Sequence, residues 1–208
     1  MRQSKKRIGI LFFSLLFLYS FGAADIHAEQ TGTITGLVKT PWVKRYQALV
    51  YIEKVEGKEF PPPKEKALMS QKNLIFKPHL LAVPKGTTVD FTNDDNVTHN
   101  VFAAPGSAES FNLGTYGVGV TKAVTFNHLG EVTLLCKVHA EMDAYIIVVQ
   151  NPYHTLTEEK TGKFEIRGVP PGTYRLKVWH EKLMDTSQEV VVAAGKSVIV
   201  DFADLKSR

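Results

Sequence analysis

The chain has 208 residues, a single cysteine and a formal net charge of +4. Without its first 28 residues it keeps 21 basic and 20 acidic residues, so most of the positive charge belongs to the N-terminus. The rest carries no clustered basic patch, which excludes a nucleic-acid surface, and one cysteine excludes an internal disulfide. The remaining length of about 180 residues suffices for one or two domains.

Residues 1–28 predict a secretory signal. Four cations between Arg2 and Arg7 precede an apolar run over 8–21, and small residues follow before the expected cleavage. The run of about 14 residues is shorter than the roughly 20 that a membrane-spanning helix requires. We therefore expect an exported, periplasmic protein with no stable membrane span after cleavage.

Residues 31–56 predict two strands, because β-branched and aromatic residues alternate with polar ones over 33–38 and 48–55. Two strands alone are marginally stable in water, so their buried face needs a partner elsewhere in the chain. Residues 57–66 contain three consecutive prolines, which favour an extended chain and cannot lie in a central strand. This segment is expected to be a linker.

Residues 67–150 predict a β-sandwich or barrel of short strands separated by turn signals. The expected strands are 73–83, 87–92, 97–103, 121–126, 131–136 and 143–149. A period of two places His99 on one strand face with Val97 and Val101. The same period places Cys136 with Val132 and Leu134, so both side chains are expected to point inward.

Residues 154–208 predict a second β unit with strands over 163–167, 173–180, 189–193 and 197–202. No helical pattern is present to cover them. The strands of 31–56 are the free partners, so 31–56 and 154–208 are expected to form one discontinuous sandwich with 67–150 inserted into it.

Cys136 opens the pattern C-x-x-H-x-x-M, with His139 and Met142 following it, and His99 precedes it on another strand. A cysteine or methionine alone most often only packs in a core. Together, however, two imidazoles, a thiolate and a weak axial thioether select copper and suit one-electron transfer. Zinc sites do not use methionine, and a catalytic Cys-His pair is usually assembled from distant positions.

The other candidate residues have simpler interpretations. Four further histidines lie beside predicted strands or turns, where an ordinary surface or core role is commoner than metal ligation: His79, His128, His154 and His180. Asp94 and Asp95 are expected to be solvated turn carboxylates. No H-E-x-x-H or other catalytic set is present, so the protein is not expected to be an enzyme.

Residues 86–93, residues 99–102 and the C-x-x-H-x-x-M motif resemble the cupredoxins, the small blue copper proteins, and most of all those with the short amicyanin-type ligand loop. Residues 32–55 and 162–174 resemble the carboxypeptidase regulatory-like domain, a transthyretin-like sandwich. The combination is similar to bacterial proteins called methylamine utilisation proteins. The implied fold is all-β, a cupredoxin Greek-key sandwich or barrel plus a second immunoglobulin- or transthyretin-like sandwich.

The resemblance implies one type 1 copper ion held by His99, Cys136 and His139 with Met142 axial. Asn100 would hydrogen-bond near the thiolate and join the two ligand-bearing loops. The implied function is a periplasmic electron carrier that exchanges single electrons with a cytochrome c or a periplasmic dehydrogenase or oxidase. Two alternatives stay open: a copper carrier without redox cycling, and an adhesion or carbohydrate-binding module in which Cys136 is merely buried.

Overall fold

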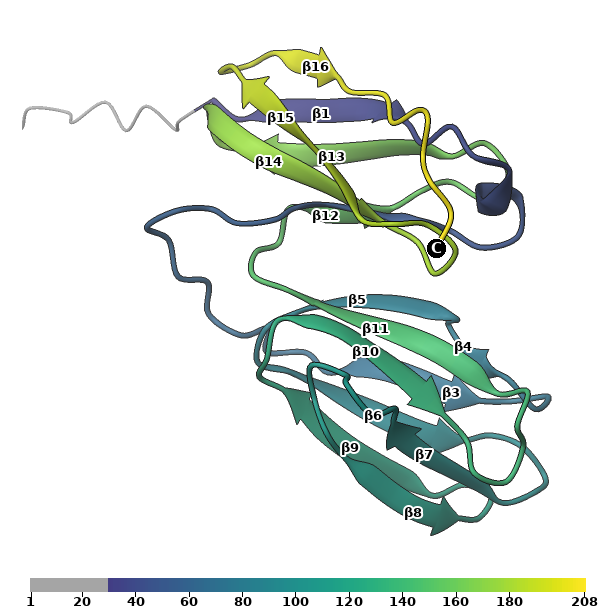
Figure 1. Cartoon of the computed structure of the whole chain (residues 1–208). Coiled ribbons are helices and arrows are strands. Elements are labelled where there is room, and N and C mark those ends of the chain that lie inside the picture. Colours follow the sequence, from purple (N-terminus) through teal and green to yellow (C-terminus); the bar gives the residue numbers. More distant parts are fainter. Residues whose placement is uncertain (1–29) are drawn as a thin grey trace, which may run out of the picture.

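The computed structural model describes residues 30–208, and the predicted signal segment lies outside them. Within this range the chain forms sixteen strands and one short 3-10 helix, Pro41–Lys44. The strands build four sheets that pack in pairs as two sandwiches, one above the other (Figure 1). The predicted all-β class is confirmed. No helix in the described range is long and apolar enough to cross a membrane.

The flanking sandwich combines the first strands of the described chain with its last ones. One sheet has the order β13-β1-β16 and the other β12-β2-β14-β15. Its strands are β1 (Gly32–Leu37), β2 (Leu49–Ile52), β12 (His154–Leu156), β13 (Lys163–Val169), β14 (Gly172–Trp179), β15 (Thr186–Val192) and β16 (Ser197–Ile199). Because β1 and β2 each lie between two later strands, the unpaired edges of the N-terminal segment are covered.

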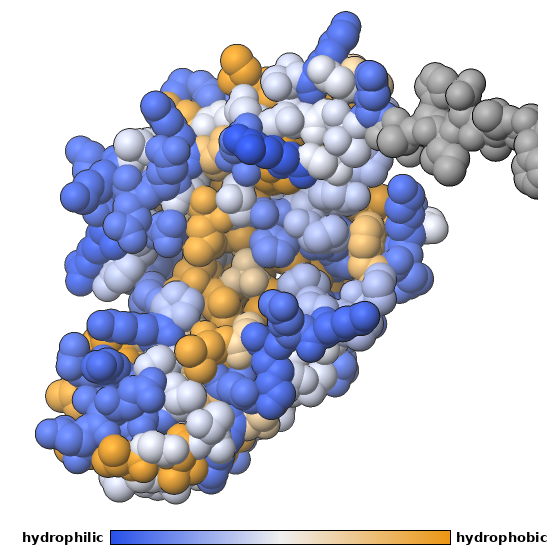
Figure 2. All heavy atoms as spheres, turned by 180° about the vertical axis from the view of Figure 1, so that it is seen from behind, coloured by the Kyte–Doolittle hydropathy of each residue, from blue (hydrophilic) through white to orange (hydrophobic). Residues whose placement is uncertain are grey.

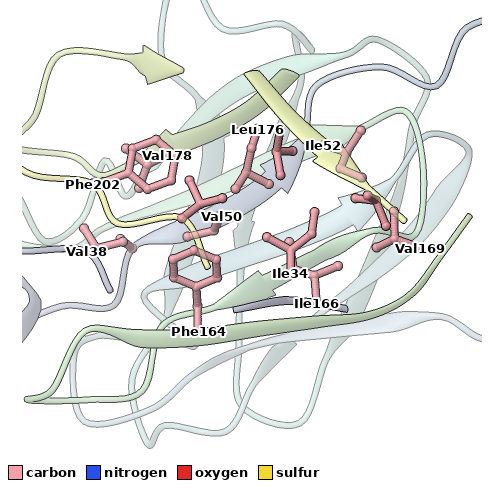
Figure 3. Close-up of a cluster of buried hydrophobic side chains, with 14 of the residues drawn as sticks. Ile34, Val38, Val50, Ile52, Phe164, Ile166, Val169, Leu176, Val178 and Phe202 are labelled. Carbon is pink, nitrogen blue, oxygen red and sulfur yellow. The ribbon is translucent and has the colours of Figure 1, made fainter. Parts of the chain in front are cut away.

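Side chains from both sheets of the flanking sandwich meet in one apolar core (Figure 3). Ile34 of β1, Val50 of β2 and Leu176 of β14 are fully buried there. Alternation along each strand sends the intervening residues outward, as in β13, where Phe164 and Ile166 are buried and Glu165 is exposed. The predicted alternation of buried and exposed residues along each strand therefore produces this core.

The middle sandwich contains the strands from β3 to β11. Its sheets have the orders β4-β3-β6-β9 and β5-β11-β10-β7-β8. The strands are β3 (Ala67–Gln71), β4 (Phe76–Lys77), β5 (Leu80–Pro84), β6 (Thr87–Asn93), β7 (His99–Ala103), β8 (Asn112–Tyr116), β9 (Thr121–Phe126), β10 (Gly130–Leu135) and β11 (Asp143–Val149). Its core is lined by large apolar side chains such as Phe91, Phe126 and Leu134.

β11 is buried on both faces and joins the two sandwiches. Ile146 and Val148 belong to the core of the middle sandwich, whereas Ile147 and Val149 pack in a separate cluster with Leu49 and Trp179 of the flanking sandwich. A strand buried on both faces needs a continuous apolar run, which the sequence Tyr-Ile-Ile-Val-Val supplies. Figure 2 shows hydrophobic residues gathered in the hollow where the two sandwiches meet.

Several predicted strands differ from those observed. The strand expected over 73–83 begins later, at β4, because Asn73 and Leu74 have positive φ, and it is divided into β4 and β5 at Pro78, which cannot donate to the ladder. β3, β8 and β12 were not predicted. Val97 precedes β7 and is exposed, so His99 shares its buried face with Val101 but not with Val97.

The core position of β1 gives a stability prediction. Ile34→Ala removes a fully buried side chain and is expected to lower the free energy of unfolding by about 2–5 kcal/mol. Ile199→Ala, on the neighbouring β16, is the matched control, because Ile199 is exposed and its loss should cost less than about 0.5 kcal/mol. Chemical denaturation followed by circular dichroism measures both. Equal losses would contradict this placement of β1.

Candidate metal centre

Strand pairing between β7 and β10 brings the two distant candidate ligands together. Leu134 faces Ala103 and Leu135 faces Phe102 in an antiparallel register. Cys136 follows β10 directly, so the chain carries it toward the start of β7, where His99 lies (Figure 1). The backbone N–H of Asn100 donates to Cys136 Sγ at 3.4 Å, which fixes the sulfur against β7.

The loop between β10 and β11 supplies the remaining candidates. It is a tight turn, in which the Met142 N–H donates to the His139 carbonyl at 3.2 Å. Met142 is fully buried in the same apolar cluster as Cys136, whereas His139 is half-buried at the sandwich end. The turn therefore places an imidazole near the surface and a thioether in the core.

Donor atoms of His99, Cys136 and His139 lie within 4.8 Å of one another. The two Nδ1 atoms of His99 and His139 are 3.1 Å apart, and His139 Nδ1 is 3.9 Å from Cys136 Sγ. An ion with metal–nitrogen bonds of about 2.0 Å and a metal–sulfur bond of about 2.3 Å holds its ligand atoms about 3–4 Å apart. The three donors thus already have the spacing of one metal site.

Asp95 orients the imidazole ring of His99. Its Oδ2 lies 2.9 Å from His99 Nε2 and also accepts the backbone N–H of Leu74. The Leu74 N–H has the largest effect and lowers the pKa of Asp95, and the His99 hydrogen bond adds to it. The carboxylate is therefore ionised and accepts a hydrogen bond from Nε2–H, which leaves the Nδ1 lone pair of His99 directed at the other donors.

Asn100 joins the two ligand-bearing segments. Its Oδ1 accepts the N–H of Lys137 at 3.4 Å, and its Nδ2 donates to Asn112 on β8 at 2.9 Å. Since Asn100 is itself buried, this side chain holds the start of the loop to β7 and β8. Fixed outer contacts of this kind orient ligands and keep them still.

The structure thus brings together three of the residues predicted for the site, His99, Cys136 and His139, and places Met142 in the adjoining core. Asn100 lies between the two segments, next to the thiol. Sequence reasoning missed Asp95, which was expected to be a solvated turn residue. Its position four residues before His99, within an Asn-Asp-Asp-Asn turn, was the available signal.

Comparison with known families supports this geometry. Residues 64–149 match the profile of the copper binding proteins of the plastocyanin/azurin family. Residues 140–199 match the profile of domain II of polysaccharide lyase family 4. The match for the later strands is therefore to a lyase-associated domain, and the carboxypeptidase regulatory-like resemblance stays a prediction. No curated protein sequence matches the chain.

Solved structures give further similarities. A purple cupredoxin from Nitrosopumilus maritimus is 24% identical with a TM-score of 0.37, and the match covers 40% of this chain and 99% of that protein. An amicyanin variant in its Cu(I) form is 19% identical over 40% of this chain and 81% of amicyanin, with a TM-score of 0.38. A copper-containing nitrite reductase from Thermus scotoductus SA-01 is 23% identical with a TM-score of 0.40. That match covers 57% of this chain and 28% of the reductase.

The middle sandwich has a cupredoxin-like fold, and the profile match over residues 64–149 supports the predicted copper cofactor, for which His99, Cys136 and His139 supply suitable donors. A thiolate and two imidazoles in a site that is largely withdrawn from water suit copper better than a hard cation such as magnesium or calcium.

Asp95→Asn tests the role of the carboxylate behind His99. A neutral amide oxygen accepts the hydrogen bond from Nε2–H more weakly than a carboxylate does, so His99 is held less firmly. Copper affinity is therefore expected to fall about 10–100-fold. Asp94→Asn is the matched control, because Asp94 accepts from Ser70 and Thr92 and does not touch His99. Competition with a chelator of known affinity measures both proteins. Equal affinity in the two variants would show that Asp95 does not position the ligand.

Proposed function

We propose that the protein is an exported electron carrier with one type 1 copper ion. The observation that carries this proposal is the triad of His99, Cys136 and His139, whose donor atoms have metal-site spacing at the end of a rigid β-sandwich. The ligand set would be these three residues with Met142 as the weak axial donor. A bound copper ion supplies one-electron chemistry by alternating between Cu(I) and Cu(II).

The residues around the triad favour rapid electron exchange because they restrain the ligands. Asp95 holds His99, the Asn100 N–H holds the sulfur of Cys136, and the Asn100 side chain holds the loop. Ligands that are fixed by outer hydrogen bonds move little when the charge at the centre changes. The apolar core around Cys136 and Met142 also excludes water.

His139 is the expected route for the electron. It is half-buried, whereas His99 is fully buried, so the His139 ring is the ligand edge nearest the surface. The residues around it are exposed and include the apolar Val138 and the small Ala140. A partner such as a cytochrome c or a periplasmic dehydrogenase or oxidase would approach this surface through a weak contact, burying under about 1,200 Å2.

The domain organisation that accompanies this proposal has two units. Residues 67–150 form the copper domain, residues 31–56 and 154–208 form the flanking domain, and residues 57–66 link them. The pairing of β1 with β13 and of β2 with β14 supports this division. The flanking domain is proposed to be carboxypeptidase regulatory-like and to have no catalytic role, and residues 1–28 to direct export to the periplasm.

A copper carrier that never changes oxidation state would use the same donors, and the half-buried His139 would equally serve as an exit for the metal. Two measurements distinguish these functions. Reversible voltammetry with slow release of copper to a chelator is expected for the electron carrier. Fast release to the chelator without reversible voltammetry would favour the copper carrier.

Addition of Cu(II) to the purified, untagged protein is expected to produce an intense blue or green absorption band, because thiolate-to-copper charge transfer is strong. Cys136→Ser removes the thiolate and His99→Ala removes a fixed imidazole, so both should lose the band. His128→Ala is the control, since His128 is exposed and pairs with Glu109, away from the proposed ligands. A band that survives in Cys136→Ser would rule out the proposed ligand set.

Met142→Leu tests the axial position. Leucine provides no donor atom and makes the pocket more apolar, which favours the lower charge of the reduced centre. The colour is therefore expected to remain while the reduction potential rises, as measured by voltammetry. Complete loss of copper binding in this variant, with the fold intact by circular dichroism, would contradict the weak axial role.

A further inference from the structure

A second group of metal-ligand side chains lies at the junction of the two sandwiches. His79 lies between β4 and β5, Asp143 begins β11, and Glu181 follows β14 of the flanking sandwich. One ligand atom from each lies within 4.8 Å of the other two. His79 Nε2 is 3.1 Å from Glu181 Oε2. Segments that are far apart in the chain thus place one imidazole and two carboxylates around a single point.

We propose that His79, Asp143 and Glu181 form a second metal site, distinct from the copper centre, that takes a divalent transition-metal ion such as zinc. Two ligands about 2.1 Å from a tetrahedral ion lie about 3.4 Å apart, close to the observed nitrogen–oxygen distance. The donor set contains no sulfur, so it suits borderline cations such as Zn²⁺ rather than Cu(I).

The imidazole is oriented before any ion arrives. The His79 ring stacks on Tyr46 at 4.1 Å between centroids, and Tyr145 meets it edge-on at 5.6 Å. The Tyr145 N–H also donates to the His79 carbonyl at 2.9 Å. These contacts fix the ring plane and direct Nε2 at Glu181, so little side-chain freedom is lost on binding.

The charge around this group favours a cation. The Glu181 side chain is only 5% exposed, and the one lysine or arginine paired with it in the described chain is Lys182, at 3.5 Å. Asp143 forms no ion pair with any of residues 30–208. A divalent ion would neutralise this excess of negative charge.

Solvent has access to one side of the group. A groove of about 280 Å3 is lined by Tyr46, Pro78 and His79, together with residues of the flanking sandwich. The groove therefore exposes His79 to solvent. Asp143 and Glu181 do not line it, and the basic residues Lys44, Arg45 and Lys160 do. Once bound, an ion would connect both sandwiches through Glu181 on one side and His79 and Asp143 on the other.

The simpler explanation is that His79 and Glu181 form an ion pair that holds the two sandwiches together, like a clasp, without a metal. The two explanations differ over Asp143. A clasp does not need this half-buried carboxylate, whereas a metal site needs its third ligand. Asp143→Asn therefore separates them, and it leaves both members of the ion pair in place.

The test is calorimetric titration of Zn²⁺ into untagged, copper-loaded protein from which excess copper has been removed. One zinc ion per chain is expected. Loss of an outer contact weakens metal sites about 10–100-fold, so loss of a ligand in Asp143→Asn or Glu181→Gln should weaken zinc binding at least about 100-fold. Glu109→Gln is the matched control, because it breaks the surface pair with His128, 3.0 Å apart, which belongs to no group of three donors among residues 30–208. Its affinity should equal that of the unchanged protein.

Thermal unfolding gives a second measurement that keeps the test valid if one variant is unstable. Zinc is expected to raise the unfolding temperature of the unchanged protein and of Glu109→Gln but not of Asp143→Asn, whose fold is checked by circular dichroism. Zinc binding in Asp143→Asn equal to that of the unchanged protein would overturn the proposal, as would the absence of zinc binding in the unchanged protein. Failure of the copper proposal would appear separately, as protein that retains no copper before zinc is added.

Discussion

The antiparallel contact between β7 and β10 is the constraint on which the rest depends. It brings together Asn100 and Cys136, which are 36 residues apart in the sequence, so that the Asn100 N–H donates a hydrogen bond to the Cys136 sulfur at 3.4 Å. Because His99 begins β7 and Cys136 follows β10, the register of two strands determines whether a thiolate and an imidazole can meet. A slip by one residue would point one of them out of the core, so the ladder specifies the chemistry as well as the fold.

The two sandwiches depend on each other through β11. The ligand loop ends at Met142, directly before the first residue of β11, so this strand anchors the C-terminal end of the loop. Ile147 and Val149 of the same strand pack against Trp179 at the junction of the two sandwiches. The indole of Trp179 in turn donates to Glu131 of β10 at 2.8 Å. Both strands that flank the ligand loop are thus held from outside by the flanking sandwich.

Much of the centre could be predicted from the sequence, because its ligands occur in a short pattern of unusual softness and in strands with clear alternation. The strands β9 and β11 were predicted with the bounds that the structure shows. The remainder depends on tertiary contacts. Asp95 resembles an ordinary turn carboxylate in the sequence. Only the fold shows that it accepts hydrogen bonds from the His99 ring and from the backbone N–H of Leu74. The turn at Leu74 also occupies the first positions of the strand expected over 73–83. His79 seemed ordinary because Glu181 lies 102 residues away.

These observations describe a sandwich that positions soft donors in a water-poor pocket, with a second sandwich supporting it. In the proposed centre a single copper ion binds the sulfur of Cys136 and the nitrogens of His99 and His139. X-ray absorption at the copper edge of the loaded protein tests it most directly. The account predicts one short copper–sulfur bond and two copper–nitrogen bonds. A spectrum with only nitrogen and oxygen neighbours would contradict it.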